Sequence, residues 1–359
     1  MAGMDSLSNI IMHSIEINKF NRYIEVMLGA GESLLQFNPK IPCLLNDSNT
    51  DLINFYKNIH ETELQIELRT FANNWKLIGK YCSFSANEIF MAFQDFNKEI
   101  ISAEDVAFMI RAIVLMNMNH EDFNPLFEKK FIVSIDMFSN AIIKSVVDTL
   151  LKLKGDDNLT DSNGSYSEYF AQNIETAIRS GIYEHFKNLI NWQKTELIDC
   201  ISLNKHLAIW FFIKELSKGH HLSYNKSGNF KNHYAGIEYN NYDLSVKVEQ
   251  VCDTKFIEKI QNAELYNYNI TDFIKEVNAK SDDVVIANFI CDNLILANGK
   301  NYSGIVSQLD QIKQIINLDT NLVILLDDES VASEFQQLTA GKLKVKKYNK
   351  TYLLSNLIG

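Results

Sequence analysis

The chain has 359 residues, of which 46% are hydrophobic, and it carries a formal net charge of −11. That length suits one large domain with insertions, and no apolar run approaches the roughly 20 residues of a membrane-spanning helix. Because the sequence contains only four arginines, a protein that grips the phosphates of DNA unaided is disfavoured.

The amino-terminal sequence and the cysteines point to a cytoplasmic protein without a metal site. The start, MAGMDSLSNIIMHSI, lacks the basic flank and cleavage site of a signal peptide. The five cysteines are scattered and form no C-x-x-C pair, which argues against a disulfide framework or a zinc site. His220 and His221 are adjacent and have no third ligand at helical spacing, so no metal site is predicted.

A predicted helix over residues 2–14 precedes the most informative stretch, residues 23–59. A short buried strand ends at Glu25, and Gly29 and Gly31 then supply a turn tight enough for a ligand to approach the backbone. A helix over 32–37 and a strand over 43–45 follow, and the strand leads into Asn46 and Asp47. The order strand, glycine turn, helix, strand and carboxylate is typical of a nucleotide-type pocket, in which the carboxylate binds a ribose.

Residues 61–154 have a strongly helical pattern. Ser102 and Asp105 predict a capping box before the run VAFMIRAIVLMNM, which is apolar nearly all round and is therefore buried or in an interface. Another helix is predicted over 131–153. Two interpretations remain open: the helices pack on one another as an ordinary insertion, or they form a docking surface for another subunit.

The next segment, GDDNLTDSNGSYS at residues 155–167, is polar and rich in turn residues and is predicted to be a linker. Helices over 169–191 and 206–216 follow it. Apolar strands over 265–269, 283–287 and 322–326, a helix over 308–316 and a hairpin over 342–357 then predict an α/β sheet with an antiparallel edge. Alternating lysines in 342–350 are typical of an exposed hairpin edge protected from aggregation.

Two segments of 23–59 carry a family resemblance. Y-I-E-x-x-x-G-x-G begins at Tyr23, and L-N-D-x-N-x-x-L-I-N-F-Y begins at Leu45. In these segments the chain resembles the Dam-like family of adenine-specific (N6) DNA methyltransferases, with Val26 and Met27 in place of the family's Pro-Phe. The resemblance implies an α/β, Rossmann-like S-adenosylmethionine-dependent methyltransferase fold with a helical insertion and a DNA-recognition-type subdomain.

The resemblance also implies a domain plan and a cofactor site. Residues 1–60 and 256–359 would form the methyltransferase-like domain, around a helical insertion (61–154), the linker (155–167) and a recognition-type subdomain (168–255). The cofactor would be S-adenosylmethionine, in a pocket either retained or lost, because Asp5 occupies the position of a family lysine. The implied cofactor-binding residues are Glu25, Gly29, Gly31, Asp47, Asp272 and Phe273.

Residues 223–236, SYNKSGNFKNHYAG, are similar to the family's R-x-N-x-x-G-x-F-N segment, which helps to hold DNA. Ser223 replaces the family's arginine, so the most obvious phosphate or base contact is missing. The implied DNA-binding residues are Asn225, Gly228, Phe230 and Lys231.

The family's catalytic motif D-P-P-Y aligns with Asn288, Phe289, Ile290 and Cys291, and none is identical. An asparagine oxygen can still accept hydrogen bonds from an adenine amino group. Cys291, however, has no ring on which a flipped base could stack, a contact worth roughly 1–3 kcal/mol. The only prolines are Pro39, Pro42 and Pro125, so no shifted alignment restores the motif.

Three hypotheses follow from this pattern. The chain is a catalytically inactive homologue, a DNA-binding or regulatory subunit of a DNA modification or restriction-type complex, whose second subunit is an active methyltransferase or a nuclease. Alternatively, it is an active adenine-N6 methyltransferase in which Asn288 accepts the amino protons and Phe289 stacks. The third hypothesis is a small-molecule or nucleotide-binding interaction module that no longer contacts DNA.

Overall fold

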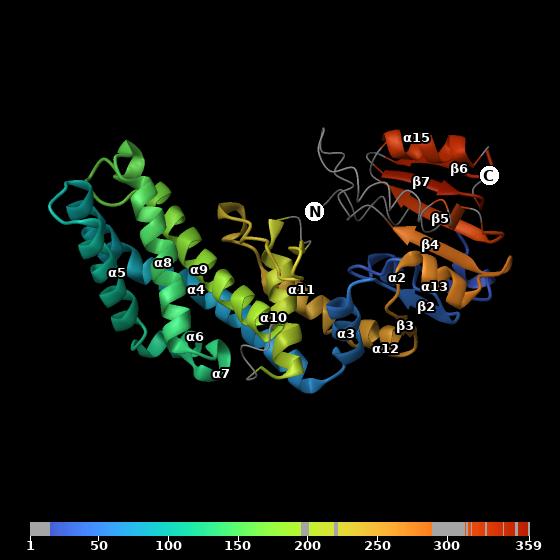
Figure 1. The fold of residues 1–359 in the computed structure, drawn as a ribbon, viewed down its shortest axis with the longest axis horizontal. Helices are drawn as coiled ribbons and strands as arrows, with labels where there is room; N and C mark the ends of the chain where they lie inside the picture. The colour runs from blue at the N-terminus through green and yellow to red at the C-terminus, as the bar shows by residue number, and fades with distance from the viewer. Residues whose placement is uncertain are drawn as a thin grey trace. The chain divides into compact units, whose positions relative to one another are not determined.

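The computed structural model describes residues 15–194, 201–218, 222–288, 313, 315–316, 318–326, 329–339, 341–348 and 351–357. The chain divides into two compact units: Met1–His60 with Asp253–Gly359, and Glu61–Cys252 (Figure 1). Several sequence predictions lie outside the described residues: the helix over 2–14 with Asp5, the pair His220-His221, most of the helix over 308–316, and Phe289, Ile290 and Cys291.

The first unit is built on a sheet. In the part of this unit that the structure describes, seven strands lie in the order β3-β2-β1-β4-β5-β7-β6. They are β1 (Tyr23–Glu25), β2 (Cys43–Asn46), β3 (Glu264–Tyr266), β4 (Val284–Asn288), β5 (Asn321–Leu326), β6 (Lys344–Tyr348) and β7 (Thr351–Ser355). The strands β3, β2, β1, β4 and β5 pair in parallel, whereas β7 is antiparallel to both β5 and β6. The predicted α/β class and the antiparallel closing hairpin are confirmed.

The strand order places a topological switch between β1 and β4. The chain proceeds from β1 to β2 and β3 on one side, and then returns to place β4 and β5 on the other side. The register pairs Tyr23 with Val284 and Glu25 with Ile286. In open α/β sheets of this type, ligands bind at the carboxyl ends of the strands, at the switch point.

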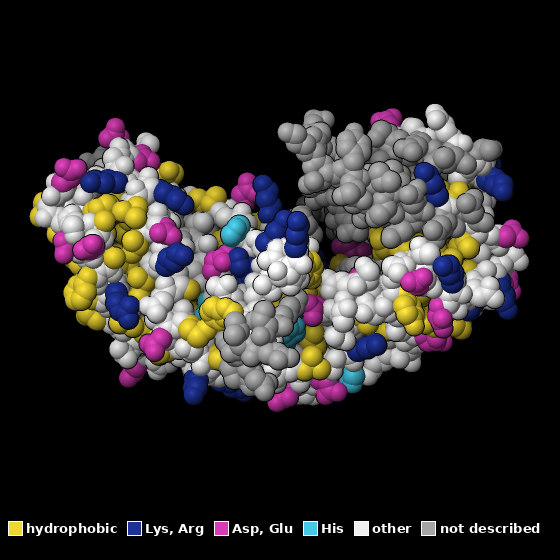
Figure 2. All heavy atoms as spheres, in the orientation of Figure 1, with side chains coloured by type: hydrophobic (Ala, Val, Ile, Leu, Met, Phe, Trp, Pro, Cys, Tyr) yellow, Lys and Arg dark blue, Asp and Glu magenta, His cyan; other side chains and the backbone are white. Residues whose placement is uncertain are grey.

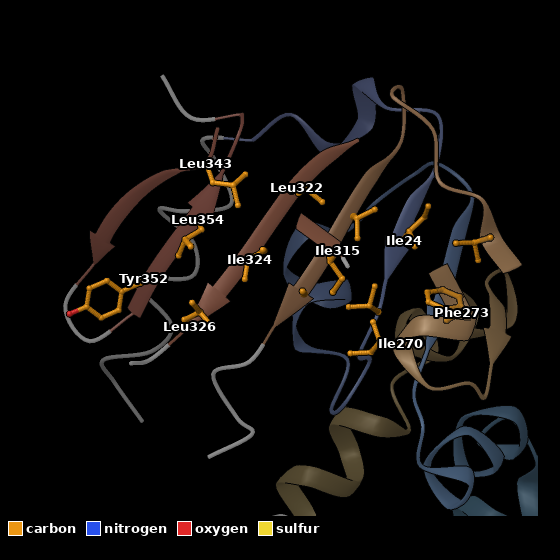
Figure 3. Packing of buried hydrophobic residues seen from close by; sticks show 14 of the residues in the cluster. Ile24, Ile270, Phe273, Ile315, Leu322, Ile324, Leu326, Leu343, Tyr352 and Leu354 are labelled. Atoms are coloured by element: carbon orange, nitrogen blue, oxygen red, sulfur yellow. The ribbon is translucent and has the colours of Figure 1, made fainter. Parts of the chain in front are cut away.

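Hydrophobic side chains cover one face of this sheet (Figure 3). Ile24 from β1, Val285 from β4 and Ile324 from β5 belong to one buried cluster. Along each strand every second side chain points to this face. Phe273 of helix α13 (Ile270–Val277) packs into this cluster, and on the other face the ring of Tyr23 lies 6.3 Å from that of Phe37 in α2 (Glu32–Phe37). The helices of the first unit are α2 (Glu32–Phe37), α3 (Thr50–Asn58), α12 (Thr254–Gln261), α13 (Ile270–Val277) and α15 (Glu329–Leu338), with a 3-10 turn at Ile17–Lys19.

The second unit is helical in its described residues. Its helices are α4 (Thr62–Asn97), α5 (Ala103–Asn117), α6 (Asn124–Phe127), α7 (Lys129–Ile132), α8 (Ile135–Leu153), α9 (Glu168–Lys194), α10 (Leu203–Leu216) and α11 (Leu244–Val251), and its 3-10 turns are Glu121–Phe123, Asp157–Leu159 and Ile237–Tyr239. The predicted capping box of α5 is confirmed: the Asp105 amide donates to Ser102 Oγ over 3.1 Å, and the Ser102 amide donates to the Asp105 carboxylate over 3.0 Å. Gly181 of α9 allows close packing on α8, since a Cβ there would lie 2.7 Å from the carbonyl oxygen of Ala141.

The segment predicted to be a linker is instead an ordered connection between α8 and α9. A 3-10 turn spans Asp157–Leu159, and Thr160 pairs with Tyr166 in an antiparallel bridge. Leu159 is buried, and the Tyr166 ring lies 5.8 Å from that of Phe90. The polar residues of this segment suit its turns, and the side chains of Leu159 and Tyr166 pack it against the helices. The residues on both sides of the segment belong to one unit.

Candidate functional site

The glycine turn after β1 has the conformation that the sequence predicts. Gly29 and Gly31 have φ angles of +51° and +72°, which side chains rarely tolerate. The Gly31 amide donates to the carbonyl oxygen of Leu28 over 2.8 Å and closes the turn. A Cβ on Gly31 would lie 3.2 Å from the ring of Phe256, so a side chain there would also crowd this ring.

Asp47 lies directly after β2 and is hydrogen-bonded to this turn. Its Oδ2 accepts from the Gly29 amide over 3.0 Å, and its Oδ1 accepts from the Asn49 amide over 2.9 Å. The hydroxyl of Tyr56 donates to the Gly29 carbonyl oxygen over 2.8 Å. The half-buried carboxylate is therefore held in one orientation at the glycine turn, as a ribose-binding group requires.

Asn46, the last residue of β2, joins the carboxyl ends of three neighbouring strands. It is fully buried, and its amide nitrogen donates to the carbonyl oxygens of Val26 and Tyr268, each over 3.0 Å. Its side-chain oxygen accepts from the Tyr268 amide over 3.0 Å. Because all of these groups are buried or partly buried, the network fixes the loops after β1, β2 and β3 relative to one another.

A buried carboxyl group lies at the switch point. Glu25 is 1% exposed and accepts a hydrogen bond from the Tyr23 hydroxyl over 2.9 Å. Burial raises the pKa of Glu25 to about 8, although hydrogen bonds from Tyr23 and Ser33 oppose that rise. Asn288, at the end of β4, donates from Nδ2 to Ser33 Oγ over 3.0 Å. A continuous polar chain therefore links β1, the first turn of α2 and the end of β4.

The remaining predicted cofactor residues lie on α13. Asp272 is exposed, and its carboxylate accepts from the Asn269 side chain over 2.6 Å. Phe273 is fully buried, with its ring centroid 5.2 Å from that of Tyr266, so its ring belongs to the core. The loop before α13 reaches the site through Asn267, whose side chain donates to the Asp47 carbonyl oxygen over 2.8 Å.

Of the predicted catalytic positions, only Asn288 is among the described residues. It is half-buried and lies at the end of β4, next to the switch point. Phe289, Ile290 and Cys291 lie outside the described residues.

The predicted DNA-binding residues lie in the second unit, where two of the four, Asn225 and Gly228, shape a turn. The side-chain oxygen of Asn225 accepts from the amides of Ser227 and Asn229 over 2.9 and 3.0 Å, and Gly228 has a φ of +76°. Phe230 is buried. Two exposed lysines lie here, Lys226 within the turn and Lys231 after it, and the family resemblance selected only Lys231.

Sequence reasoning did not assign Asn46, Ser33 or Tyr56 to the site. Asn46 precedes the predicted ribose ligand, and Tyr56 belongs to the matched L-I-N-F-Y segment, so both were visible as motif positions. Ser33 was recognisable only as a polar residue in the first turn of a short helix. Its role depends on Asn288, which lies 255 residues away in sequence.

The described residues contain neither a metal-binding cluster nor a membrane-spanning helix. No group of three histidine, cysteine, aspartate or glutamate side chains there is placed to hold a metal ion. No helix among the same residues is long and apolar enough to cross a membrane.

Comparison with known proteins supplies no family: no protein-family model matches the chain, and no curated protein matches it significantly.

Proposed function

We propose that the first unit is a Rossmann-like methyltransferase-type domain that binds S-adenosylmethionine at the carboxyl ends of β1, β2 and β4. The observation that carries this proposal is the hydrogen bond between Asp47 and the glycine turn at the switch point. Asp47 would accept hydrogen bonds from the ribose hydroxyls, and Gly29–Gly31 would flank the methionine moiety. The antiparallel β7 agrees with the edge that methyltransferase sheets commonly have.

We further propose that the chain does not methylate adenine alone and acts as a DNA-binding or regulatory subunit. Asn288 can accept from an adenine amino group, but the sequence after it lacks both prolines and the tyrosine of the family motif. Methyl transfer or cleavage would then come from a second subunit, an active methyltransferase or a nuclease. Contact with DNA would involve the exposed Lys226 and Lys231 within that complex.

Titration of the purified protein with S-adenosylmethionine tests the pocket. We expect saturable binding that Asp47→Ala weakens by at least about tenfold, because hydrogen bonds to a charged group contribute about 1.5–3 kcal/mol. Glu276→Ala, which removes an exposed carboxylate from the same unit, is the control and should leave the affinity unchanged. Equal affinities for wild type and Asp47→Ala would show that the ribose does not bind at Asp47.

The alternative, an active adenine-N6 methyltransferase, is favoured by one observation. The side chain of Asn288 is oriented at the end of β4 by the hydrogen bond that its Nδ2 donates to Ser33 Oγ.

A methylation assay with duplex DNA, followed by mass spectrometry of the nucleosides, distinguishes the two functions. For an inactive subunit we expect no N6-methyladenine from the protein alone; addition of its copurifying partner should give N6-methyladenine if the partner is a methyltransferase, or cleaved DNA if it is a nuclease. Methylation by the protein alone that disappears in Asn288→Ala, while Asn321→Ala at the opposite end of the neighbouring strand retains it, would establish the alternative.

A further inference from the structure

The chain passes between the two units at two points, and each of them lies next to a helix of the first unit. Helix α3 (Thr50–Asn58) precedes the first passage, which follows His60, and helix α12 (Thr254–Gln261) begins after the second, which follows Cys252. The two helices contact each other (Figure 1). A structural change in the second unit that moves either passage therefore acts on α3 or α12.

Both helices place an aromatic ring against the glycine turn of the candidate site. The hydroxyl of Tyr56 in α3 donates to the Gly29 carbonyl oxygen over 2.8 Å, and a Cβ on Gly31 would lie 3.2 Å from the ring of Phe256 in α12. The two rings pack edge to face with their centroids 5.8 Å apart, and both residues are buried. Figure 2 shows mainly backbone and polar side chains over α3, in keeping with this burial. The turn is thus held by both of the helices that lead to the second unit.

The conformation of this turn depends on such contacts from outside it. Gly29 and Gly31 have positive φ angles and no side chain, so their own backbones restrict the turn less than other residues would. The Gly29 amide is fixed by Asp47 over 3.0 Å, and its carbonyl oxygen is fixed by Tyr56. Helix α3 joins both contacts, because Asn49, its N-cap, donates from its amide to the Asp47 carboxylate over 2.9 Å. A shift of α3 would therefore disturb the turn and the carboxylate together.

Phe256 is tied to the second passage by the cap of its helix. Asp253, the first residue after that passage, accepts hydrogen bonds from the amides of Lys255 and Phe256 over 3.0 and 3.1 Å. A displacement of Asp253 would therefore carry the Phe256 ring with it.

We propose, on the basis of the S-adenosylmethionine pocket proposed above, that Tyr56 and Phe256 are positioning residues that couple donor binding at the glycine turn to the conformation of the second unit. A bound donor fixes the turn, and through the two rings it fixes α3, α12 and the two passages. Because such coupling is reciprocal, DNA that holds the second unit in the same state raises the affinity for the donor by the same factor.

Hydrogen exchange of the full chain, with and without saturating S-adenosylmethionine, tests this coupling. For wild type we expect the donor to slow exchange in peptides of the glycine turn and of α3. We also expect slower exchange in second-unit peptides that cover the start of α4 and α11 (Leu244–Val251), which do not belong to the pocket.

Tyr56→Phe removes only the hydroxyl and should separate the two effects. The donor affinity should fall about two- to tenfold, the value of one neutral hydrogen bond. At saturating donor the peptides of the turn should still be protected, whereas the protection of the second-unit peptides should be largely lost. Phe256→Leu, which opens space beside Gly31, should give the same loss. Tyr352→Phe is the matched control: it removes the hydroxyl of a buried tyrosine of β7, on the antiparallel side of the sheet, and should behave like wild type.

Circular dichroism equal to that of wild type verifies that each variant is folded. Failure of wild type to bind the donor would contradict the proposed pocket and the coupling together. Donor binding that leaves the second-unit peptides unprotected, or equal protection of these peptides in Tyr56→Phe and wild type, would overturn the coupling alone.

Discussion

Replacing Arg22 by methionine is expected to lower the free energy of unfolding of the first unit by about 3 kcal/mol. Asp283 is 1% exposed and receives two hydrogen bonds from the Arg22 guanidinium, over 3.0 and 2.5 Å. Arg22 also donates to the carbonyl oxygens of Val277 and Asn278, and so joins the start of β4 to the end of α13. The substitution would leave a buried carboxylate without its cation.

The loss of unfolding free energy in Arg22→Met depends on the protonation of Asp283. Burial alone would raise the pKa of Asp283, but the hydrogen bonds from Arg22 and Lys280 outweigh it and hold the pKa below its ordinary value. The ion pair therefore stabilises the fold above the pKa of an unfolded aspartate, and that stability is lost as the pH falls. The difference between wild type and Arg22→Met should narrow below about pH 4.

Hydrogen exchange of peptides that cover β1 and β4 measures this loss in the first unit. All three tryptophans, Trp75, Trp192 and Trp210, lie in the second unit, so tryptophan fluorescence reports the other unit and should not change. Lys275→Met is the matched control, because it breaks an exposed ion pair with Asp272 and should cost less than about 1 kcal/mol. Equal losses in both variants would contradict the role given to Arg22.

Glu25→Gln is expected to change how strongly the free energy of unfolding of the first unit depends on pH. The pKa of Glu25 is about 8 in the folded protein, against an ordinary value of 4.5, so the folded state holds a proton that the unfolded state releases between these values. Unfolding therefore becomes easier as the pH rises through this window. Relative to Glu25→Gln, wild type should lose about 3 kcal/mol between pH 5 and pH 8, at up to about 1.4 kcal/mol per pH unit.

Exchange of β1 peptides at several pH values, corrected for the intrinsic pH dependence of exchange, tests this expectation. Glu276→Gln removes an exposed carboxylate of the same unit and should follow wild type at each pH. A stability difference between wild type and Glu25→Gln that stays constant from pH 5 to pH 8 would show that Glu25 is not held protonated by burial.

The parts of the fold that depend on local chemistry were predictable from the sequence. The glycines of the turn, the apolar runs of β4 and β5 and the capping box at Ser102 each express a preference over a few residues, and the structure confirms them. The predicted strand over 265–269 was partly wrong, because β3 ends at Tyr266 and Asn269 caps α13.

The contacts that assemble the site were not predictable from one sequence. Asn288 meets Ser33, and Asn46 meets Tyr268, across more than two hundred residues, and no local pattern specifies such pairs. The α5 segment shows the same limit. This helix is apolar nearly all round, a pattern compatible with burial or with an interface. The helices that pack against it determine which of its faces is covered and which is exposed.

A crystal structure of the protein grown with S-adenosylmethionine tests the central claim most directly. We predict that the donor occupies the carboxyl ends of β1 and β2, with both ribose hydroxyls within hydrogen-bonding distance of the Asp47 carboxylate and the methionine moiety beside Gly29–Gly31. A donor bound elsewhere, or a switch point without donor at saturating concentration, would contradict the claim that this unit is a methyltransferase-type domain with a working cofactor pocket.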